Sequence, residues 1–439
     1  MPAGEVRLGL IGLGTVGTSV VQLLEQNADP IAKKVGRALR IACVGSRSVH
    51  TKPHPELGTA QVSEDPWVVV RDPHIDVLIE LIGGLEPARE LVLEAIERGK
   101  DVVTANKALL ALHGNEIFAA AEARGVYVGF EAAVAGGIPI IRTLREGLAA
   151  DQNRALFGIV NGTCNYILTT MSEQGEEFAA VLARAQEQGL AEADPSFDID
   201  GIDAAHKLTL LATLAFGVYV PFANVYTEGI RHISQIDISF AQEFGYAIKL
   251  LAIAKDEAGE VDVRVHPTMI PRRSLLADVG GAYNAIFVQG EALGSSLYFG
   301  RGAGGMPTAT AVLSDVIEVA HNRRVATSVR VPPLGYAWQD LRTIPIRPID
   351  DLVSEYYLRF MVMDRLGVLA KIAGILGDHN ISIAAVIQRG RGEGDESIPL
   401  VMRTHAAREQ NLKAALRLVD QLPTVQGQSV SIRIEENLG

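Results

Sequence analysis

The chain has 439 residues, 48% of them hydrophobic, so two or three domains with sizeable cores are expected. Its formal net charge of −12 at pH 7 argues against a general nucleic-acid binder, because that affinity rests on basic contacts to phosphate. The chain has only two cysteines, without zinc-ligand spacing, and shows no signal-peptide pattern and no apolar run suited to a bilayer, so we expect a cytoplasmic protein that contacts no membrane.

The first third of the chain alternates apolar strand candidates with helical stretches. The strand candidates read VRLGLI, RIACVG, VLIELI and DVVTA. This alternation of strands and helices predicts an α/β domain with a doubly wound parallel sheet over residues 1–131. Longer helices and alternating strands predict an α+β domain over 132–305. Residues 306–352 are expected to form a helix that returns to the first domain and a Pro-rich linker, and 353–439 a compact βαββαβ unit.

A glycine-rich turn follows the first predicted strand and opens a helix. It reads Gly12-Leu13-Gly14-Thr15-Val16-Gly17, the arrangement of a dinucleotide-binding Rossmann fingerprint. We expect Gly12 to form the tight turn, Gly14 to let backbone N–H groups approach a pyrophosphate, and Gly17 to let helix pack on strand. The alternative is a glycine-rich turn without a ligand.

The ends of the next strands suggest which dinucleotide binds. The second strand ends in CVGSRS, with Arg47 where an NAD enzyme often has an acidic residue. A guanidinium pairs with a 2′-phosphate, so NADP is preferred over NAD, although a solvated arginine is the competing explanation. Gly83 follows VLIELI at the carboxyl edge of the sheet, where backbone contact with the cofactor is expected. Lys107 follows the strand DVVTA and faces the same crevice.

Two further glycine-rich segments are less specific. The sequence EAAVAGGIPI, which begins at Glu131, predicts a sharp bend whose carbonyls and carboxylate suit a hard cation. Gly304 and Gly305 belong to a loop before a helix. For this loop, a structural turn and a cover for the cofactor are equally good interpretations.

The acidic segment before an apolar helix is the most informative part of the chain. Asp203 and Lys207 are one helical turn apart and share a face. A surface ion pair would be the ordinary interpretation of this spacing. The apolar run LTLLATLAFG that follows instead favours a polar pocket, because a charge carried into a buried helix has to be paired. Other carboxylates crowd the preceding loop: Glu192, Asp194, Asp198 and Asp200.

Together these motifs resemble the homoserine dehydrogenase family, in its monofunctional bacterial form with a C-terminal ACT domain. The resemblance covers essentially the whole chain. Its most specific part is GLAEADPSFDIDGIDAAHK, supported by GLGTVG, TANK, EAAVAGGIP, NGTCNYIL and GRGAGGMPTA. It implies a Rossmann domain, a catalytic and dimerisation domain, and a regulatory ACT domain.

The resemblance also implies a reaction: reduction of L-aspartate 4-semialdehyde to L-homoserine with NAD(P)H, in threonine, methionine and isoleucine biosynthesis. Lys207 would be the proton donor, Glu192 would bind the substrate amino group, and Asp198 and Asp203 would orient them. Lys107 would touch substrate and cofactor. A sodium or potassium ion would be held by the Glu131 carboxylate and by three carbonyls, those of Val134, Gly136 and Ile138.

The C-terminal unit is expected to bind an amino-acid effector. MVMDRLGVLAKIAGIL followed by HNISIAAV resembles an ACT domain, with Gly367 where a ligand backbone approaches. Feedback inhibition by L-threonine and a homodimer or homotetramer follow from the resemblance. A purely dimerising domain is the alternative.

Two other functions compete with this interpretation. Another Rossmann oxidoreductase of amino-acid metabolism would share the fold, but the acidic loop with Lys207 argues against it. A non-catalytic sensor of nucleotide and amino acid would have no need of a proton donor. Turnover of L-aspartate 4-semialdehyde distinguishes the three.

Overall fold

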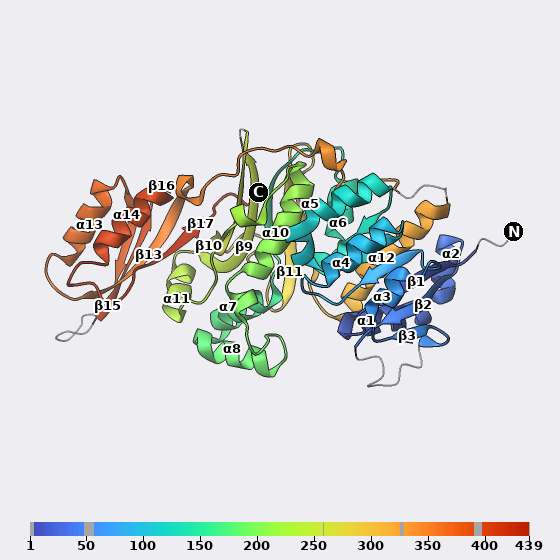
Figure 1. The fold of residues 1–439 in the computed structure, drawn as a ribbon. Coiled ribbons are helices and arrows are strands. Elements are labelled where there is room, and N and C mark those ends of the chain that lie inside the picture. Colours follow the sequence, from blue (N-terminus) through green and yellow to red (C-terminus); the bar gives the residue numbers. More distant parts are fainter. Residues whose placement is uncertain (1–3, 48–56, 258, 325–328, 390–396, 439) are drawn as a thin grey trace. The chain divides into compact units, whose positions relative to one another are not determined.

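The computed structural model describes residues 4–47, 57–257, 259–324, 329–389 and 397–438 (Figure 1). These residues divide by their contacts into two compact units. Unit 1 holds residues 1–160, 203–225 and 283–344, and unit 2 holds 161–202, 226–282 and 345–439. Each unit is described by itself.

Unit 1 contains a six-stranded parallel sheet in the order β3-β2-β1-β4-β5-β6. The strands are β1 (Val6–Ile11), β2 (Leu39–Gly45), β3 (Gln61–Ser63), β4 (Val77–Glu80), β5 (Asp101–Thr104) and β6 (Val128–Gly129). The chain order reverses between β1 and β4. In open α/β sheets, this switch point opens a crevice at the carboxyl ends of the strands, where ligands bind.

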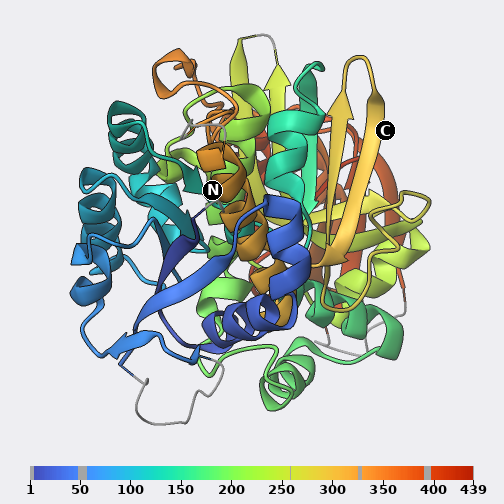
Figure 2. The ribbon, with the colours of Figure 1, turned by 90° about the vertical axis from the view of Figure 1, so that its right-hand side faces the viewer.

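Helices cover both faces of this sheet, and its central strands β1, β4 and β5 are buried along almost their whole length. The helices are α1 (Thr15–Gln26), α2 (Ala28–Val35), α3 (Pro66–Arg71), α4 (Ala88–Glu97), α5 (Lys107–Arg124) and α12 (Gly305–Arg324). One core joins Leu8 and Ile79 of the sheet to Val20 of α1 and to Val312 and Val316 of α12. Although almost 300 residues separate them in the chain, α12 lies beside α1 (Figure 2).

The rest of unit 1 surrounds a long buried helix and three antiparallel strands. The strand order is β12-β11-β7. These elements are η2 (Glu131–Ala133), α6 (Ile140–Arg142), η3 (Thr143–Gly147), β7 (Asn153–Ile159), α10 (Ile202–Phe216), η4 (Phe222–Asn224), β11 (Tyr283–Gly290), β12 (Gly294–Arg301) and η5 (Trp338–Asp340).

Unit 2 combines a long antiparallel hairpin with helices and a C-terminal βαββαβ unit. The hairpin consists of β9 (Tyr246–Glu257) and β10 (Glu260–Pro271). Near it are α7 (Gly162–Gln174), α8 (Phe178–Glu187), α9 (Ser196–Ile199), β8 (Tyr226–Thr227) and α11 (Gln235–Glu243). The C-terminal elements are η6 (Ile349–Asp351), β13 (Val353–Met363), α13 (Val368–Asp378), β14 (Ile383–Gln388), β15 (Ser397–Thr404), β16 (Ala407–Arg408), α14 (Glu409–Val419) and β17 (Val430–Ile434).

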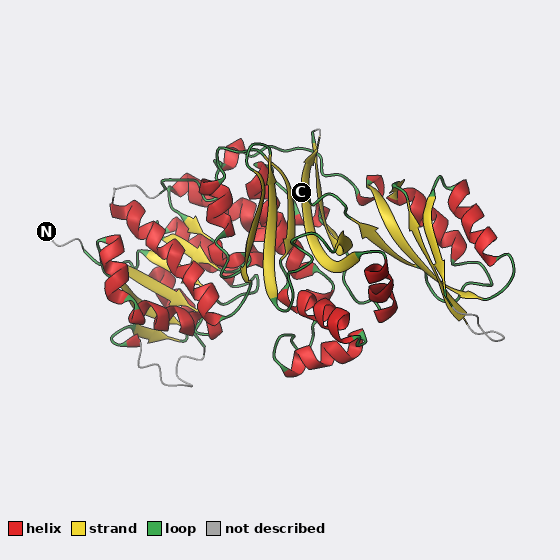
Figure 3. Ribbon diagram, turned by 180° about the vertical axis from the view of Figure 1, so that it is seen from behind, coloured by secondary structure: helices red, strands yellow, loops and turns green. Residues whose placement is uncertain are grey.

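The last strand joins the C-terminal elements to the hairpin. β17 pairs in parallel with β10 and antiparallel with β13, giving the order β9-β10-β17-β13-β15-β14. Helices α13 and α14 cover one face of these C-terminal strands (Figure 3), with Leu358 and Phe360 packed against Ile372 and Leu412. The C-terminal core therefore forms against a sheet that continues into the hairpin.

The predicted fold class is confirmed: a doubly wound N-terminal sheet, a mixed α+β region and a C-terminal βαββαβ unit. The four segment boundaries predicted from the sequence stay a prediction. Among the described residues, no helix combines the length and apolar character that a membrane span requires.

Candidate active site

The glycine-rich turn has the geometry that its sequence predicts. Gly12 adopts φ +98°, and a Cβ there would lie 2.6 Å from the Leu81 carbonyl oxygen. A Cβ on Gly17 would lie 2.1 Å from the Gly12 oxygen, so α1 packs directly on the turn. Gly14, the residue before α1, has open space where its side chain would be. Backbone N–H groups at a helix start can therefore approach a phosphate here.

A pocket of about 690 Å³ opens at the switch point of the sheet. It is lined by the glycine turn, by Gly83 after β4, and by Arg47 after β2. Glu64 lines the same pocket. The geometry thus gathers predicted cofactor residues from three strand ends around one cavity, whose wall also holds two carboxylates, those of Glu64 and Glu86.

Glu80 organises two of these strand ends, a role that the sequence reasoning missed. It is completely buried at the end of β4, and burial raises its pKa. One carboxylate oxygen accepts the N–H groups of Ile82 (2.9 Å) and Gly83 (3.2 Å), and the other accepts the Thr104 hydroxyl (2.6 Å). Its sequence signal is a carboxylate inside an otherwise apolar strand, three residues before the glycine pair Gly83-Gly84.

Asn106 connects the same strand ends to Lys107. Its side-chain oxygen caps α5 by accepting the Leu109 N–H, and its side-chain nitrogen donates to the Gly84 carbonyl at 2.7 Å. Lys107 is the first residue of this capped helix. The lysine therefore starts from a backbone that is fixed to the cofactor-pocket loop.

The second glycine loop packs against the start of α1. A Cβ on Gly305 would lie 2.4 Å from the Ser19 hydroxyl and 3.2 Å from the Thr15 carbonyl, so only glycine fits. Gly304 adopts φ +119°. The loop therefore packs on α1 just after the dinucleotide turn, and both interpretations from the sequence, a structural turn and a cofactor cover, stay predictions.

Asp203 brings two lysines together. Lys207 Nζ lies 2.8 Å from Asp203 Oδ2, and Lys107 Nζ lies 3.1 Å from Asp203 Oδ1. Lys207 Nζ also donates to the Val160 carbonyl, just after β7, at 2.6 Å. The Lys207 side chain is 11% exposed and that of Lys107 32%. The structure therefore pairs a buried ammonium group with a more accessible one across a single carboxylate.

This arrangement depends on how α10 is buried. Every residue from Asp203 to Phe216 is buried, so Asp203 and Lys207 need polar partners inside the protein. Each carboxylate oxygen of Asp203 has a lysine at hydrogen-bonding distance, and Lys207 has a carbonyl as well. The charges that the apolar helix carries are therefore paired, as the sequence predicts.

Glu192 and Asp198 belong to unit 2. Asp198 accepts hydrogen bonds from Asn161 Nδ2 at 2.8 Å and Thr163 Oγ1 at 3.2 Å, which fix its carboxylate. Glu192 is exposed. Their convergence with Lys207, which belongs to unit 1, stays a prediction.

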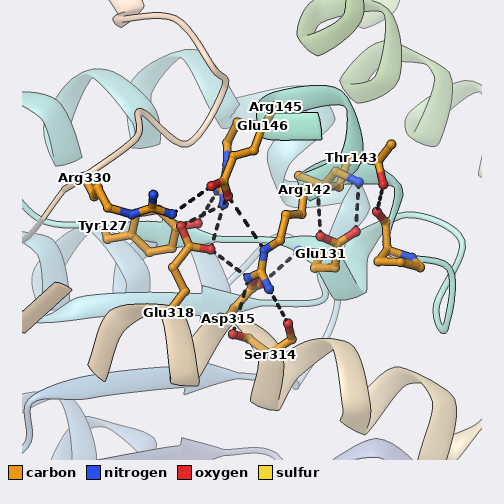
Figure 4. Close-up of polar contacts among 12 residues, drawn as sticks. Tyr127, Glu131, Arg142, Thr143, Arg145, Glu146, Ser314, Asp315, Glu318 and Arg330 are labelled. Atoms are coloured by element: carbon orange, nitrogen blue, oxygen red, sulfur yellow. Dashed lines mark hydrogen bonds and ion pairs between the residues drawn. The ribbon is translucent and has the colours of Figure 1, made fainter. Parts of the chain in front are cut away.

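Glu131 lies in a dense polar cluster (Figure 4). Its carboxylate oxygens accept the backbone N–H groups of Ile141 (2.8 Å) and Arg142 (2.9 Å), so it caps α6. Burial raises its pKa. The Glu131 N–H donates to Asp315 of α12, and Arg142 pairs with Glu318 of the same helix. These contacts tie the bend after β6 to α12.

The bend itself is tightly constrained. Ala135 has φ +55°, unusual for a residue with a side chain, and Gly136 has φ +48°. A Cβ on Gly136 would lie 2.5 Å from the Gly302 carbonyl oxygen, and the Gly137 N–H donates to the Arg301 carbonyl. The bend and the loop before α12 therefore hold each other in place.

Comparison with known proteins explains this combination. The family model described as "Homoserine dehydrogenase" matches residues 139–317, the model of its NAD-binding domain matches 12–131, and the ACT-domain model matches 356–424. The homoserine dehydrogenase of Pseudomonas aeruginosa is 47% identical over 433 residues, covering 98% of this chain and 99% of the relative. The chain belongs to the homoserine dehydrogenase family.

Solved structures agree with the assignment. The crystal structure of a homoserine dehydrogenase from Thiobacillus denitrificans matches with a TM-score of 0.94 and 47% identity, covering 100% of both chains. A hyperthermophilic archaeal homoserine dehydrogenase in complex with NADPH matches with a TM-score of 0.62 and 26% identity, covering 72% of this chain and 97% of that one. The chain is thus an oxidoreductase with a nicotinamide-cofactor domain and an ACT domain.

Proposed function

We propose that this enzyme reduces L-aspartate 4-semialdehyde to L-homoserine with NADPH, and that Lys207 supplies the proton. The observation that carries the proposal is the pair of lysines held by Asp203 within the fold of this family. Two of its features suit an aldehyde reductase: a buried ammonium group near its counter-ion, and a second, more exposed ammonium at the start of α5.

The role of the lysines follows from the charge that develops on the substrate during hydride addition. The cofactor, when bound, supplies the hydride that is added to the aldehyde carbon. Negative charge then develops on the carbonyl oxygen, and the Lys207 ammonium stabilises that charge and donates the proton. Lys207 already donates to the Val160 carbonyl and to Asp203, and both acceptors favour its protonated form. Lys107 contacts substrate and cofactor in this proposal.

The cofactor residues fit a dinucleotide. The glycine turn 12–17 would take the pyrophosphate at the start of α1, with Gly83 and the loop of Gly304 and Gly305 beside it. Arg47, in the pocket wall, would pair with the 2′-phosphate of NADP. The archaeal relative solved in complex with NADPH shows that a protein of this family binds that cofactor.

The substrate ammonium group would be bound by carboxylates of the acidic loop. Asp198 keeps a fixed carboxylate through Asn161 and Thr163, and Glu192 is exposed to a ligand. The carboxylates would bind the substrate ammonium group, and the lysines would bind its aldehyde oxygen. Held at both ends, the substrate would be oriented for reaction.

A monovalent cation would bind at the bend after β6. The donor set is the Glu131 carboxylate with the carbonyls of Val134, Gly136 and Ile138, all hard oxygen ligands that suit sodium or potassium. The carboxylate is buried, which favours a cation beside it. The ion would fix the bend that connects β6 to α6 and would take no part in the proton transfer.

Threonine would bind to the ACT domain as an inhibitor, in a homodimer or homotetramer. Gly367 has φ +84° at the start of α13, with open space where a side chain would lie, so a ligand backbone can approach. Leu366 is fully exposed beside it, and Leu369 and Val386 are exposed as well. An apolar surface of this kind suits pairing with a second ACT domain.

The test is NADPH oxidation by the purified protein with L-aspartate 4-semialdehyde, measured for wild type, Lys207→Ala and the exposed-site control Lys34→Ala. We expect turnover in wild type and control and a loss of at least about 100-fold in Lys207→Ala, the contribution of one general acid. The absence of turnover in folded, NADPH-binding wild-type protein would reject the substrate. Full activity of Lys207→Ala would reject the proton donor.

A further inference from the structure

The segment from Tyr226 to Arg231 lies against α9, the short helix that carries Asp198. The Ile230 N–H donates to the Ile199 carbonyl at 2.8 Å. A Cβ on Gly229 would lie 2.2 Å from that same oxygen, so the two backbones are in direct contact. Arg231 binds the side chains of Asp200 and Ser196. We call residues 226–231 the strap, since they hold both ends of α9.

The strap is anchored on its other side by Arg433 of β17. Arg433 Nη1 lies 2.8 Å from Glu228 Oε2, and its Nη2 donates to the Tyr226 hydroxyl at 3.2 Å. The Tyr226 hydroxyl in turn donates to the same Glu228 oxygen at 2.9 Å. Because the Arg433 side chain is 7% exposed, these contacts are largely shielded from water.

Arg433 is itself fixed inside the C-terminal domain. Its guanidinium binds Glu409 at the start of α14 with two nearly parallel hydrogen bonds, of 2.9 and 2.5 Å. The Tyr356 hydroxyl of β13 donates to Glu409 at 2.9 Å. Arg433 is therefore bound to the start of one ACT helix, α14, on one side and to Tyr226 and Glu228 of the strap on the other.

We propose that Arg433 and Glu228 are positioning residues for α9 and its Asp198 carboxylate. Arg433 holds Glu228, the strap holds Ile199 and Asp200, and these neighbours place the Asp198 carboxylate for the substrate ammonium group. This inference rests on the proposed role of Asp198. A change in the C-terminal domain would reach the substrate ammonium site through these contacts and would leave the lysine pair in place.

The main experiment compares the kinetics of Glu228→Ala with wild type. We expect the KM for L-aspartate 4-semialdehyde to rise about 3- to 30-fold, the range that mutations on a coupling path produce. The kcat and the affinity for NADPH should stay within about twofold, because Lys207, Lys107 and the cofactor pocket keep their contacts. Glu228→Gln keeps an acceptor for Arg433 and should recover part of the loss.

Two further variants make the result decisive. Arg231→Met removes the contacts of the strap with Asp200 and Ser196. Because Arg231 is exposed, the variant should fold, and its KM for L-aspartate 4-semialdehyde should rise as in Glu228→Ala. Lys255→Gln is the matched control: it breaks the 2.8 Å pair with Glu435, which also joins the hairpin to the residues after β17, but it leaves the strap intact. Its KM should equal that of wild type.

The outcomes separate the two proposals. Wild-type protein that fails to reduce the semialdehyde would reject the proposed function, whatever the variants do. Active wild type with an unchanged KM in both Glu228→Ala and Arg231→Met would overturn the positioning role alone. An equal KM increase in Lys255→Gln would also overturn it, because general loosening of the domain contact would then be the cause.

Discussion

Asp203 Oδ2 lies 2.8 Å from Lys207 Nζ, one turn further along α10, while its other oxygen faces Lys107. A single buried carboxylate thus sets the positions of two ammonium groups that start from different helices. Its charge offsets part of the cost of burying Lys207. Removing that charge without changing the side-chain shape should therefore affect both lysines at once.

Asp203→Asn is predicted to lower kcat about 10- to 100-fold, the loss expected for one or two charge-assisted hydrogen bonds. An amide can accept from one lysine with its oxygen, but it turns its NH2 group toward the other. Steady-state kinetics with NADPH and L-aspartate 4-semialdehyde measure the change, with the exposed Asp340→Asn as control. An unchanged kcat would show that the lysines are positioned without the carboxylate.

Arg47→Asp is predicted to reverse the cofactor preference. The substitution replaces a cation that pairs with the 2′-phosphate by a carboxylate that repels it and can bind the ribose hydroxyls of NADH. The ratio of kcat/KM for NADPH to that for NADH should fall by about tenfold or more, the effect of about 1.4 kcal/mol. An unchanged ratio would show that Arg47 is solvated and not the determinant.

Glu64→Gln changes the charge of the same pocket wall in the opposite direction to Arg47→Asp and should shift the cofactor preference the other way. Removing a carboxylate from the wall should strengthen NADPH binding relative to NADH, because repulsion of the 2′-phosphate is lost. Fluorescence titration of both cofactors measures the two dissociation constants. If the two variants move the ratio in the same direction, charge in this wall does not select the cofactor.

Features encoded in a short stretch of backbone could be predicted from the sequence. The roles of Gly12, Gly14 and Gly17 depend on a strand, a turn and a helix start that are adjacent in the chain, and the structure gives each glycine the expected geometry. The spacing of Asp203 and Lys207 indicated a shared helix face for the same reason.

Contacts between distant segments could not be predicted. Lys107 reaches Asp203 across 96 positions, and nothing in either sequence neighbourhood specifies the other. Glu80 lies in an otherwise apolar strand, and the Thr104 hydroxyl reaches it only when β4 and β5 pair, although its other partners Ile82 and Gly83 are close in the chain. The capping of α6 by Glu131 likewise depends on the path of the chain after the bend.

Glu80→Gln is predicted to weaken NADPH binding and lower stability. The amide oxygen keeps an acceptor for the N–H groups of Ile82 and Gly83, but the NH2 group cannot accept the hydrogen that the Thr104 hydroxyl donates to the carboxylate. The loss of one buried hydrogen bond to a charged group costs about 1.5–3 kcal/mol. We expect a lower thermal midpoint and a higher dissociation constant for NADPH; Glu97→Gln, at the end of α4, is the control. Wild-type values in Glu80→Gln would show that the carboxylate does not hold the loop.

Because His266 is buried and neutral, we predict that the free energy of unfolding falls in acid. It is 1% exposed in β10, its Nε2 atom accepts a hydrogen bond from Arg264 Nε at 3.1 Å, and its Nδ1 atom lies 2.9 Å from the Pro267 carbonyl. This geometry requires a neutral imidazole with its proton on Nδ1. Burial, together with the charges of Arg433 and Arg264, holds its pKa well below the usual 6.5.

The direction of the pH effect on stability follows from proton uptake by the unfolded chain. Below pH 6.5 the unfolded chain binds a proton at His266 and the folded chain does not, so the free energy of unfolding falls as the pH falls. The contribution is about 1.4 kcal/mol at pH 5.5 relative to neutral pH. His266→Gln keeps an acceptor for Arg264 and a donor for Pro267 but does not titrate. Urea unfolding midpoints at pH 7.5 and 5.5 should therefore differ less in the variant than in wild type, and an equal difference in both would place the acid sensitivity in other groups.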